Sequence, residues 1–271
     1  MSSFLEAAVE IAHEAGSLLR HYFERRVRFE MKGEFDLVTE ADRASEKLIV
    51  ERLKQQFPEH GVVAEEGGGH ASSSAYRWYV DPLDGTTNFA HGYPVWNVTL
   101  ALEKDGELIA GVVFDPTRDE LFAAERGSGA FVNGRRTRVS QADRVADGLF
   151  CTGFPNHNRA TNPNIHYFHE LAMSAHGVRR GGSAALDLAY VAAGRLDGFW
   201  EIGLNPWDMA AGILLIEEAG GVCTDMKGAR HHLRSPHILA DNGLVHDEVL
   251  ALFVRIQEGN FPHAISGVAG I

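Results

Sequence analysis

The segment Trp78–Phe89 reads WYVDPLDGTTNF, an apolar run that stops at two acids. The apolar part is typical of a buried strand, and the Asp, Pro, Gly and Thr residues after it are typical of a turn. Two carboxylates at such a strand end, Asp81 and Asp84, raise each other's proton affinity unless a cation or strong hydrogen-bond donors hold them ionised. The pattern predicts a positive partner at this point, with a plain turn as the alternative.

The composition of the chain limits the classes of protein to consider. Its 271 residues suffice for one large α/β unit or two closely packed lobes, and a hydrophobic content of 45% allows a sizeable core. The formal net charge of −12 disfavours nucleic acid and anionic membranes, because both would meet a negative field. Glu6 and Glu10 interrupt the N-terminal apolar pattern, unlike in a signal peptide. We therefore expect a cytoplasmic protein without nucleic-acid or membrane partners.

The first half of the chain changes from a helical to a strand pattern. Apolar residues recur at helical spacing over about 3–25 and again over about 40–57, and Thr39 is suited to be the N-cap of the second helix. From Gly61 onward the pattern is that of strands separated by Asp-Gly and Asn-Gly turns. This part predicts an antiparallel meander with no parallel sheet. We expect residues 1–145 to form an α+β lobe.

After about residue 145, strand patterns alternate with helical ones. Strand-like stretches such as GLFCTGF and DGFWEIG stand among helical ones such as SAALDLAYVAAG and PWDMAAGILLIEEAGG. This alternation favours an α/β lobe over residues 146–271. Because no low-complexity linker separates the two parts, both are expected to share one compact body.

Three further acids lie at predicted strand or helix ends. Glu65 follows the apolar run Val62–Ala64, Asp208 lies in the first turn of a helix, and Asp42 lies near the start of the second helix. Each has an ordinary alternative. Paired glutamates on a loop are usually solvated, and an acid in a first helical turn is favoured by the helix dipole.

Four stretches taken together and in this order resemble the inositol monophosphatase family. They are LVTEAD (Leu37–Asp42), AEEGG (Ala64–Gly68), WYVDPLDGTTNF (Trp78–Phe89), and NPWDMAAG with EEAGG (Asn205–Gly221). The resemblance covers essentially the whole chain, and Arg179–Gly203 is similar to the bacterial inositol-1-monophosphatase branch. It implies a layered αβαβα sandwich of the inositol monophosphatase and fructose-1,6-bisphosphatase type, dependence on Mg²⁺, inhibition by lithium, and a homodimer.

The resemblance also assigns metal ligands, residue by residue. They are the carboxylates of Glu65, Asp81, Asp84 and Asp208 and the backbone carbonyl of Leu83. A site of oxygen ligands suits two or three Mg²⁺ ions, or Mn²⁺, and does not suit zinc, whose structural sites favour Cys and His. The resemblance further implies that Thr86, hydrogen-bonded to Asp42, orients and helps to activate a water molecule. Glu65 belongs to the same catalytic set.

A substrate site follows from the same resemblance. Its members are Asp84, Gly85, Thr86, Gly182, Ser183, Ala184, Glu201 and Asp208. Gly85 and Thr86 would donate backbone N–H groups to phosphate, and Glu201 takes the place of an acid that contacts ring hydroxyls in the inositol branch. A strand-end surface acid is the ordinary alternative for Glu201. Lys32 falls near the family's active-site lysine and is left out of the site.

These assignments predict a metal-dependent phosphomonoesterase that hydrolyses myo-inositol monophosphates with a metal-activated water. Histidinol phosphate, fructose 1,6-bisphosphate and a 3′-phosphoadenosine nucleotide are alternative substrates within the same fold. A regulatory protein that uses the scaffold to bind a partner, with Arg135, Arg136 and Arg138 as a possible surface, is an alternative of another class. The interval from Glu66 to Trp78 is short and rich in Gly and Ser, which departs from the family and predicts that the family's mobile loop over the metals closes differently here.

Overall fold

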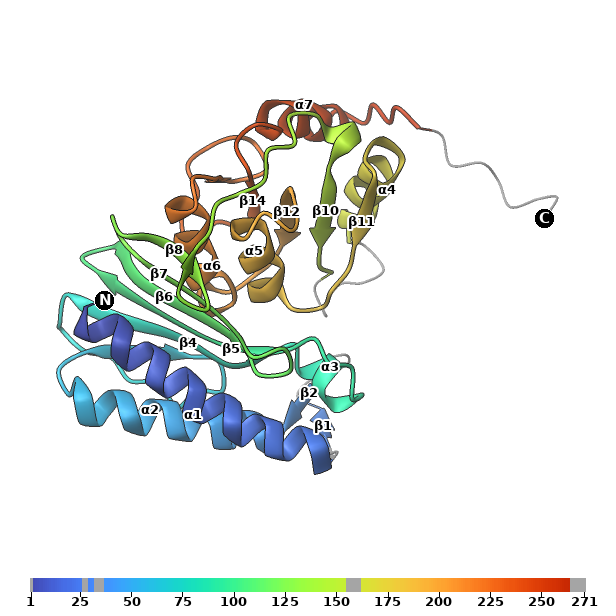
Figure 1. Ribbon diagram of the computed structural model, residues 1–271. Helices are drawn as coiled ribbons and strands as arrows, with labels where there is room; N and C mark the ends of the chain where they lie inside the picture. The colour runs from blue at the N-terminus through green and yellow to red at the C-terminus, as the bar shows by residue number, and fades with distance from the viewer. Residues whose placement is uncertain (1, 26–28, 32–36, 155–161, 264–271) are drawn as a thin grey trace.

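The computed structural model describes residues 2–25, 29–31, 37–154 and 162–263. Its helices are α1 (Ser3–Arg25), α2 (Glu40–Gln56), α3 (Thr86–Ala90), α4 (Asn164–Ser174), α5 (Ala184–Ala192), α6 (Pro206–Glu218) and α7 (His246–Gln257), with a 3₁₀ turn η1 (Val145–Asp147). Figure 1 shows α1 and α2 on one face of a large sheet and α5 and α6 on the other. A second sheet follows, with α4 and α7 beyond it. These five layers confirm the αβαβα fold.

The large sheet has seven strands in the order β3-β4-β5-β6-β7-β8-β9. They are β3 (Gly61–Ala64), β4 (Tyr76–Asp84), β5 (Asn97–Lys104), β6 (Glu107–Asp115), β7 (Glu120–Glu125), β8 (Gly129–Val132) and β9 (Arg135–Arg136). From β4 to β9 all neighbours are antiparallel, which confirms the predicted meander. The prediction is wrong for β3, which pairs with β4 in parallel. Residues 65–75 connect the end of β3 to the start of β4, which lies at the opposite end of the strand pair. They have no helical pattern from which a crossover connection could be predicted.

The second sheet has five strands in the order β11-β10-β12-β14-β13. They are β10 (Leu149–Thr152), β11 (Gly177–Arg179), β12 (Gly198–Ile202), β13 (Val222–Thr224) and β14 (His237–Asp241). β10 pairs in parallel with β11 and β12, and β14 is antiparallel to β12 and β13. The strand β11 was not predicted, because three residues are too few for a periodic pattern. The two sheets come from opposite sides of residue 145, although a boundary there stays a prediction.

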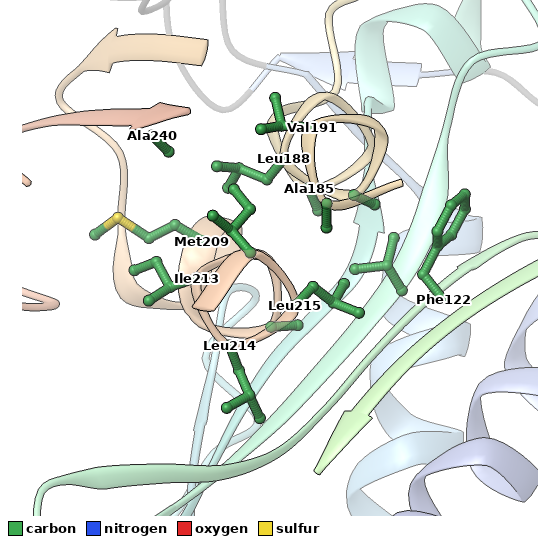
Figure 2. Packing of buried hydrophobic residues seen from close by; sticks show 14 of the residues in the cluster. Phe122, Ala185, Leu188, Val191, Met209, Ile213, Leu214, Leu215 and Ala240 are labelled. Carbon is green, nitrogen blue, oxygen red and sulfur yellow. The ribbon is translucent and has the colours of Figure 1, made fainter. Parts of the chain in front are cut away.

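Small residues let α6 pack closely between its neighbours. A Cβ at Gly212 of α6 would lie 2.5 Å from the Cβ of Leu188 on α5, and one at Gly111 of β6 would lie 3.1 Å from the backbone of Ala211. Figure 2 shows the apolar side chains of this layer, among them Leu188, Val191, Ile213, Leu215 and Phe122. Such packing fixes α6, and with it the N-terminal turn that carries Asp208, against the large sheet.

Two smaller features complete the fold. β1 (Phe29–Met31) and β2 (Leu37–Thr39) form an antiparallel pair just before α2. Thr39 caps α2 as predicted, since its hydroxyl accepts hydrogen bonds from the backbone N–H groups of Ala41 and Asp42. Among the described residues, no helix has the length and apolar character needed to cross a membrane.

Candidate metal and phosphate site

A bulge in β4 brings Asp81 and Asp84 to the same face of the sheet. Asp81 is opposite Thr99 on β5, whereas Asp84 is opposite Asn97, so three steps along β4 match two steps along β5. Residues three apart on a regular strand point to opposite faces, and the extra residue cancels that alternation. Pro82 lies inside the bulge, where its missing N–H costs no ladder bond. Because of the bulge, the two aspartates lie on one face of the sheet and can share a ligand.

The parallel pairing of β3 with β4 delivers Glu65 to the same edge. Ala64 at the end of β3 is opposite Val80, so the next residues along the two strands are Glu65 and Asp81. The backbone N–H of Glu65 donates to the carbonyl of Val80 at 3.3 Å. An antiparallel β3 would have placed Glu65 at the far end of β4. The pairing that sequence patterns missed is the one that assembles the predicted site.

Asp208 arrives from the other side of the large sheet, on the first turn of α6. Its Oδ2 accepts a hydrogen bond from the backbone N–H of Asn205 at 2.7 Å in a capping box, and Pro206 fills the first helical position. Asp208 therefore does help to cap the start of α6, which was the ordinary alternative for this acid. It commits one carboxylate oxygen and fixes the orientation of the other.

The other three predicted acids lie close enough to Asp81 for their charges to act on it. Burial raises the pKa of Asp81 well above its ordinary value, and the charges of Glu65, Asp84 and Asp208 raise it further. Burial also raises the pKa of Asp84 and raises that of Asp208 to about 7. These pKa values are lowered mainly by hydrogen bonds. Among the described residues, no positively charged side chain is a main cause of lowering.

A hard divalent cation fits this lining. Across the part of the chain that the structure describes, no group of three or more His, Cys, Asp or Glu side chains is arranged so that it could hold a metal ion. The carboxylates are nevertheless close enough to repel one another, and all of their donor atoms are oxygen. Buried acids that raise each other's pKa are stabilised by a cation between them, and oxygen donors favour Mg²⁺ or Mn²⁺. The chemistry of the donor atoms suits such ions, and the metal ligands stay a prediction.

Thr86 and Asp42 form the predicted hydrogen-bonded pair beside the bulge. Thr86 Oγ1 lies 3.0 Å from Asp42 Oδ1 and 3.0 Å from the carbonyl oxygen of Leu83. The other oxygen of Asp42 accepts from the backbone N–H of Thr39 at 2.7 Å and from its hydroxyl at 2.5 Å. Burial raises the pKa of Asp42 despite these bonds. The carboxylate is thus fixed in orientation and suited to accept a proton.

The Asp84 carboxylate also holds α5 against the large sheet. Its Oδ2 accepts hydrogen bonds from Asn97 at 2.9 Å, from the Ser183 hydroxyl at 2.7 Å and from the backbone N–H of Ala185 at 2.8 Å. Ser183 is the N-cap of α5 and is buried. Sequence reasoning missed Asn97, which has no recognisable motif. Ser183, which was predicted to contact substrate, thus supports Asp84, a predicted metal ligand.

Glu201 lies on β12 and is buried, with 7% of its surface exposed, so it is not a surface acid. Burial raises its pKa well above the ordinary value, and the charges of Asp187 and Asp208 add to that effect. A Cβ at Gly153 would lie 2.2 Å from its carboxylate, which therefore lies directly against the backbone of Gly153. Asp187, buried on α5, is a neighbouring acid that sequence reasoning did not single out.

The backbone ahead of Thr86 explains its glycine. Gly85 has a φ of +93°, and a Cβ there would lie 2.8 Å from the carbonyl oxygen of Val95. Only glycine adopts this conformation in this space without strain. Gly182, with a φ of +86°, lies beside Asn88 in the turn before α5. Lys32 lies outside the described residues.

Comparison with known proteins agrees with this geometry. The model of the inositol monophosphatase family matches residues 1–258. An inositol-1-monophosphatase of Mesorhizobium japonicum is 45% identical over 253 residues, covering 92% of this chain and 95% of the relative. The Nus factor SuhB of Pseudomonas aeruginosa is 46% identical over 250 residues, covering 89% and 92%. The crystal structure of the extragenic suppressor protein suhB from Bartonella henselae matches with a TM-score of 0.89 and 43% identity, covering 93% and 98%.

Proposed function

The chain belongs to the inositol monophosphatase family and is a phosphatase, and from that premise we propose that it is a Mg²⁺-dependent phosphomonoesterase that hydrolyses myo-inositol 1-phosphate to inositol and phosphate. The observation that carries the proposal is that three other acids, which follow β3 or lie on β4 and α6, all raise the pKa of the buried Asp81. A homodimer and sensitivity to lithium stay predictions of the family resemblance, and a cytoplasmic location stays a prediction from the sequence.

The acids and one backbone carbonyl would hold the ions. Two or three Mg²⁺, or Mn²⁺, would be bound by Glu65, Asp81, Leu83, Asp84 and Asp208. When bound, such ions neutralise charge on phosphoryl oxygens and lower the pKa of water. Phosphoryl transfer needs mainly alignment and charge neutralisation, so a rigid oxygen lining is suited to it.

The pair Thr86 and Asp42 supplies a route for the proton. A hydroxyl carries one hydrogen, so Thr86 donates either to Asp42 or to the Leu83 carbonyl at any time. When the carbonyl faces a cation, Asp42 is the better acceptor. The attacking water then donates a hydrogen bond to Thr86 Oγ1. As the water proton passes to Thr86, the Thr86 hydroxyl proton passes to Asp42, whose raised pKa suits a general base.

The two halves of the substrate would contact different elements. The phosphate would lie against the backbone N–H groups of Gly85 and Thr86 at the start of α3. The alcohol would lie toward Glu201 on β12, whose buried carboxylate accepts hydrogen bonds from hydroxyl groups. This arrangement favours an alcohol rich in hydroxyls over an aromatic one.

A panel of phosphate esters tests the proposal. Phosphate release would be measured with saturating Mg²⁺ for inositol 1-phosphate, histidinol phosphate, fructose 1,6-bisphosphate and a 3′-phosphoadenosine nucleotide. We expect kcat/KM to be highest for inositol 1-phosphate and to vanish on chelation of Mg²⁺. The variant Glu201→Gln is expected to lower kcat/KM for inositol 1-phosphate by about tenfold, since a hydrogen bond to a charged group contributes about 1.5 kcal/mol.

Two outcomes would contradict the proposal. A much higher kcat/KM for one of the other esters would change the substrate and leave the metal chemistry in place. No turnover of any ester by the Mg²⁺-loaded chain would favour the partner-binding alternative, with which the name of the Pseudomonas relative is compatible.

A further inference from the structure

Glu46 on α2 is a buried acid to which the proposed mechanism gives no role. It is 4% exposed, and both of its carboxylate oxygens accept hydrogen bonds from backbone N–H groups. Oε2 accepts from Glu66 and Oε1 from Gly68, each at 2.7 Å. Hydrogen bonds to an ionised carboxylate are short and about twice as strong as neutral ones. Glu46 thereby holds the two ends of the turn that immediately follows Glu65.

Glycine at position 68 is required by this contact. A Cβ at Gly68 would lie 2.6 Å from Glu46 Oε1, which is closer than a carbon and an oxygen can approach. The φ of Gly68 is not in the left-handed region, so the need for glycine comes from the carboxylate and not from backbone strain. Gly67 makes the turn itself, with a φ of +88°. The acid and the glycine are complementary in shape.

A second anchor lies two residues farther on. His70 and Val62 exchange backbone hydrogen bonds of 2.8 and 2.9 Å, which tie the chain back to β3. Together with the Glu46 bonds, they hold the part of the predicted loop that is nearest to the metal ligands. In this interval, Gly68 allows the Glu46 carboxylate to approach the backbone, and Gly67 forms the turn.

One face of α2 contacts three segments that carry site residues. Asp42 accepts from Thr86 of α3, Ser45 donates to the carbonyl of Pro82 in the β4 bulge at 2.8 Å, and Glu46 accepts from the segment after β3. Residues spaced by three and four lie on the same side of a helix. A rigid helix therefore sets the relative positions of segments that are distant in sequence.

We propose that Glu46 is a positioning residue that orients Glu65 for metal binding. The parallel pairing with β4 fixes the backbone before Glu65, and the Glu46 carboxylate fixes it directly after. With both sides held, the backbone position from which the Glu65 side chain leaves is fixed, next to Asp81 in the parallel register. This inference rests on the proposed function, because it takes Glu65 as a metal ligand.

The variant Glu46→Gln tests the inference, with Glu51→Gln on the exposed face of the same helix as the matched control. Glutamine keeps one acceptor oxygen but turns an NH₂ group toward the second backbone N–H. Mg²⁺ binding would be measured by calorimetry without substrate. We expect about tenfold weaker binding in Glu46→Gln, the size of effect typical of groups that support a metal ligand, and unchanged binding in Glu51→Gln. Turnover at saturating Mg²⁺ should fall less than the affinity.

A second readout follows the contact itself. Hydrogen exchange of the Gly68 amide, measured by NMR, should accelerate in Glu46→Gln and stay unchanged in Glu51→Gln, with circular dichroism confirming that both variants fold. The variant Gly68→Ala approaches the same contact from the other side and leaves α2 intact. It should weaken Mg²⁺ binding to a similar extent. The double variant should lose little more than either single one, since both changes break one interaction.

The inference would be overturned if Glu46→Gln and Gly68→Ala folded and bound Mg²⁺ like the wild type, or if their effects simply added. Failure of the proposed function would look different. A wild-type chain that binds Mg²⁺, loses that binding in Glu46→Gln and hydrolyses no phosphate ester would support the role of Glu46 while removing the proposed activity. A wild-type chain that binds no divalent ion would overturn both.

Discussion

Two Asp-Pro dipeptides occur in the large sheet, in strands on either side of β5. The surroundings of their aspartates differ in charge. Asp81 precedes Pro82 in β4, and Asp115 precedes Pro116 at the end of β6. Both aspartates are buried, at 2% and 0% exposure. Three residues farther along, the first has another acid, Asp84, where the second has Arg118.

Among the described residues, the Asp115 carboxylate accepts hydrogen bonds from its own turn. Its Oδ1 accepts from the N–H and hydroxyl of Thr117 at 2.8 and 2.7 Å, and its Oδ2 accepts from Arg118 at 2.7 Å. Asp81 accepts one backbone N–H, from Leu83 at 3.0 Å, and three other acids raise its pKa. A buried acid that shapes a turn is neutralised by the chain, whereas the acid proposed to bind a cation is left in repulsion with other acids.

The largest effect is expected when the acid in mutual repulsion, Asp81, is neutralised, and it is an effect on turnover. The variant Asp81→Asn should lower Mg²⁺-dependent phosphate release by about 10²–10³-fold, the loss typical of removing one electrostatic group from an active site. Without metal it should unfold about 2–4 °C higher, because about 1 kcal/mol of repulsion is relieved. Phosphate release and thermal unfolding measure the two effects. Full activity, or a clear loss of stability without metal, would remove the metal assignment.

Stability against pH is expected to show the same repulsion. The pKa values of Asp81 and Asp84 are raised above 3.8 in the folded chain, and that of Asp208 is raised to about 7. Folding therefore favours the protonated acids, so this contribution to stability is complete below about pH 4 and is lost as pH rises through about 7. The metal-free chain should unfold at lower temperature as pH rises from about 5 to about 8, by about 5 °C.

Saturating Mg²⁺ should remove most of that decrease, because the bound ion stabilises the ionised acids. The variant Asp208→Asn without metal serves as the control, and its decrease should be smaller. A metal-free wild-type chain whose unfolding temperature rises over the same pH interval would show that the acids do not repel one another as inferred.

The smallest effect is expected at the partnered aspartate. Asp115→Asn keeps an acceptor oxygen for the turn but loses the charge that pairs with Arg118, whose side chain is 42% exposed and can be hydrated. We expect a loss of about 1–2 kcal/mol in the free energy of unfolding, measured with urea. Mg²⁺ affinity and turnover should stay within about twofold of the wild type. A loss of Mg²⁺ affinity as large as that in Asp81→Asn would erase the distinction between the two dipeptides.

Local patterns in the chain were enough to predict much of the molecule. The helices α1 and α2, the cap at Thr39, the meander from β4 to β9 and the α/β alternation after residue 145 all follow from spacing and turn chemistry. The acids of the candidate site were found because they belong to recognisable stretches at strand and helix ends. Periodicity, capping and turn formation depend on neighbours within a few residues, so a sequence shows them directly.

Other features depended on which segments meet. The parallel pairing of β3, the β4 bulge that brings Asp81 and Asp84 to one face, and the donors that Asn97 and Ser183 give to Asp84 have no local pattern. The two bonds of Glu46 likewise join residues 20 and 22 positions apart. By itself, the sequence of this protein determined most of its elements and its family, and through the family its layered fold. Only the tertiary structure decided the strand register and side-chain partners that turn scattered acids into one site, because such contacts depend on long-range packing that no short window contains.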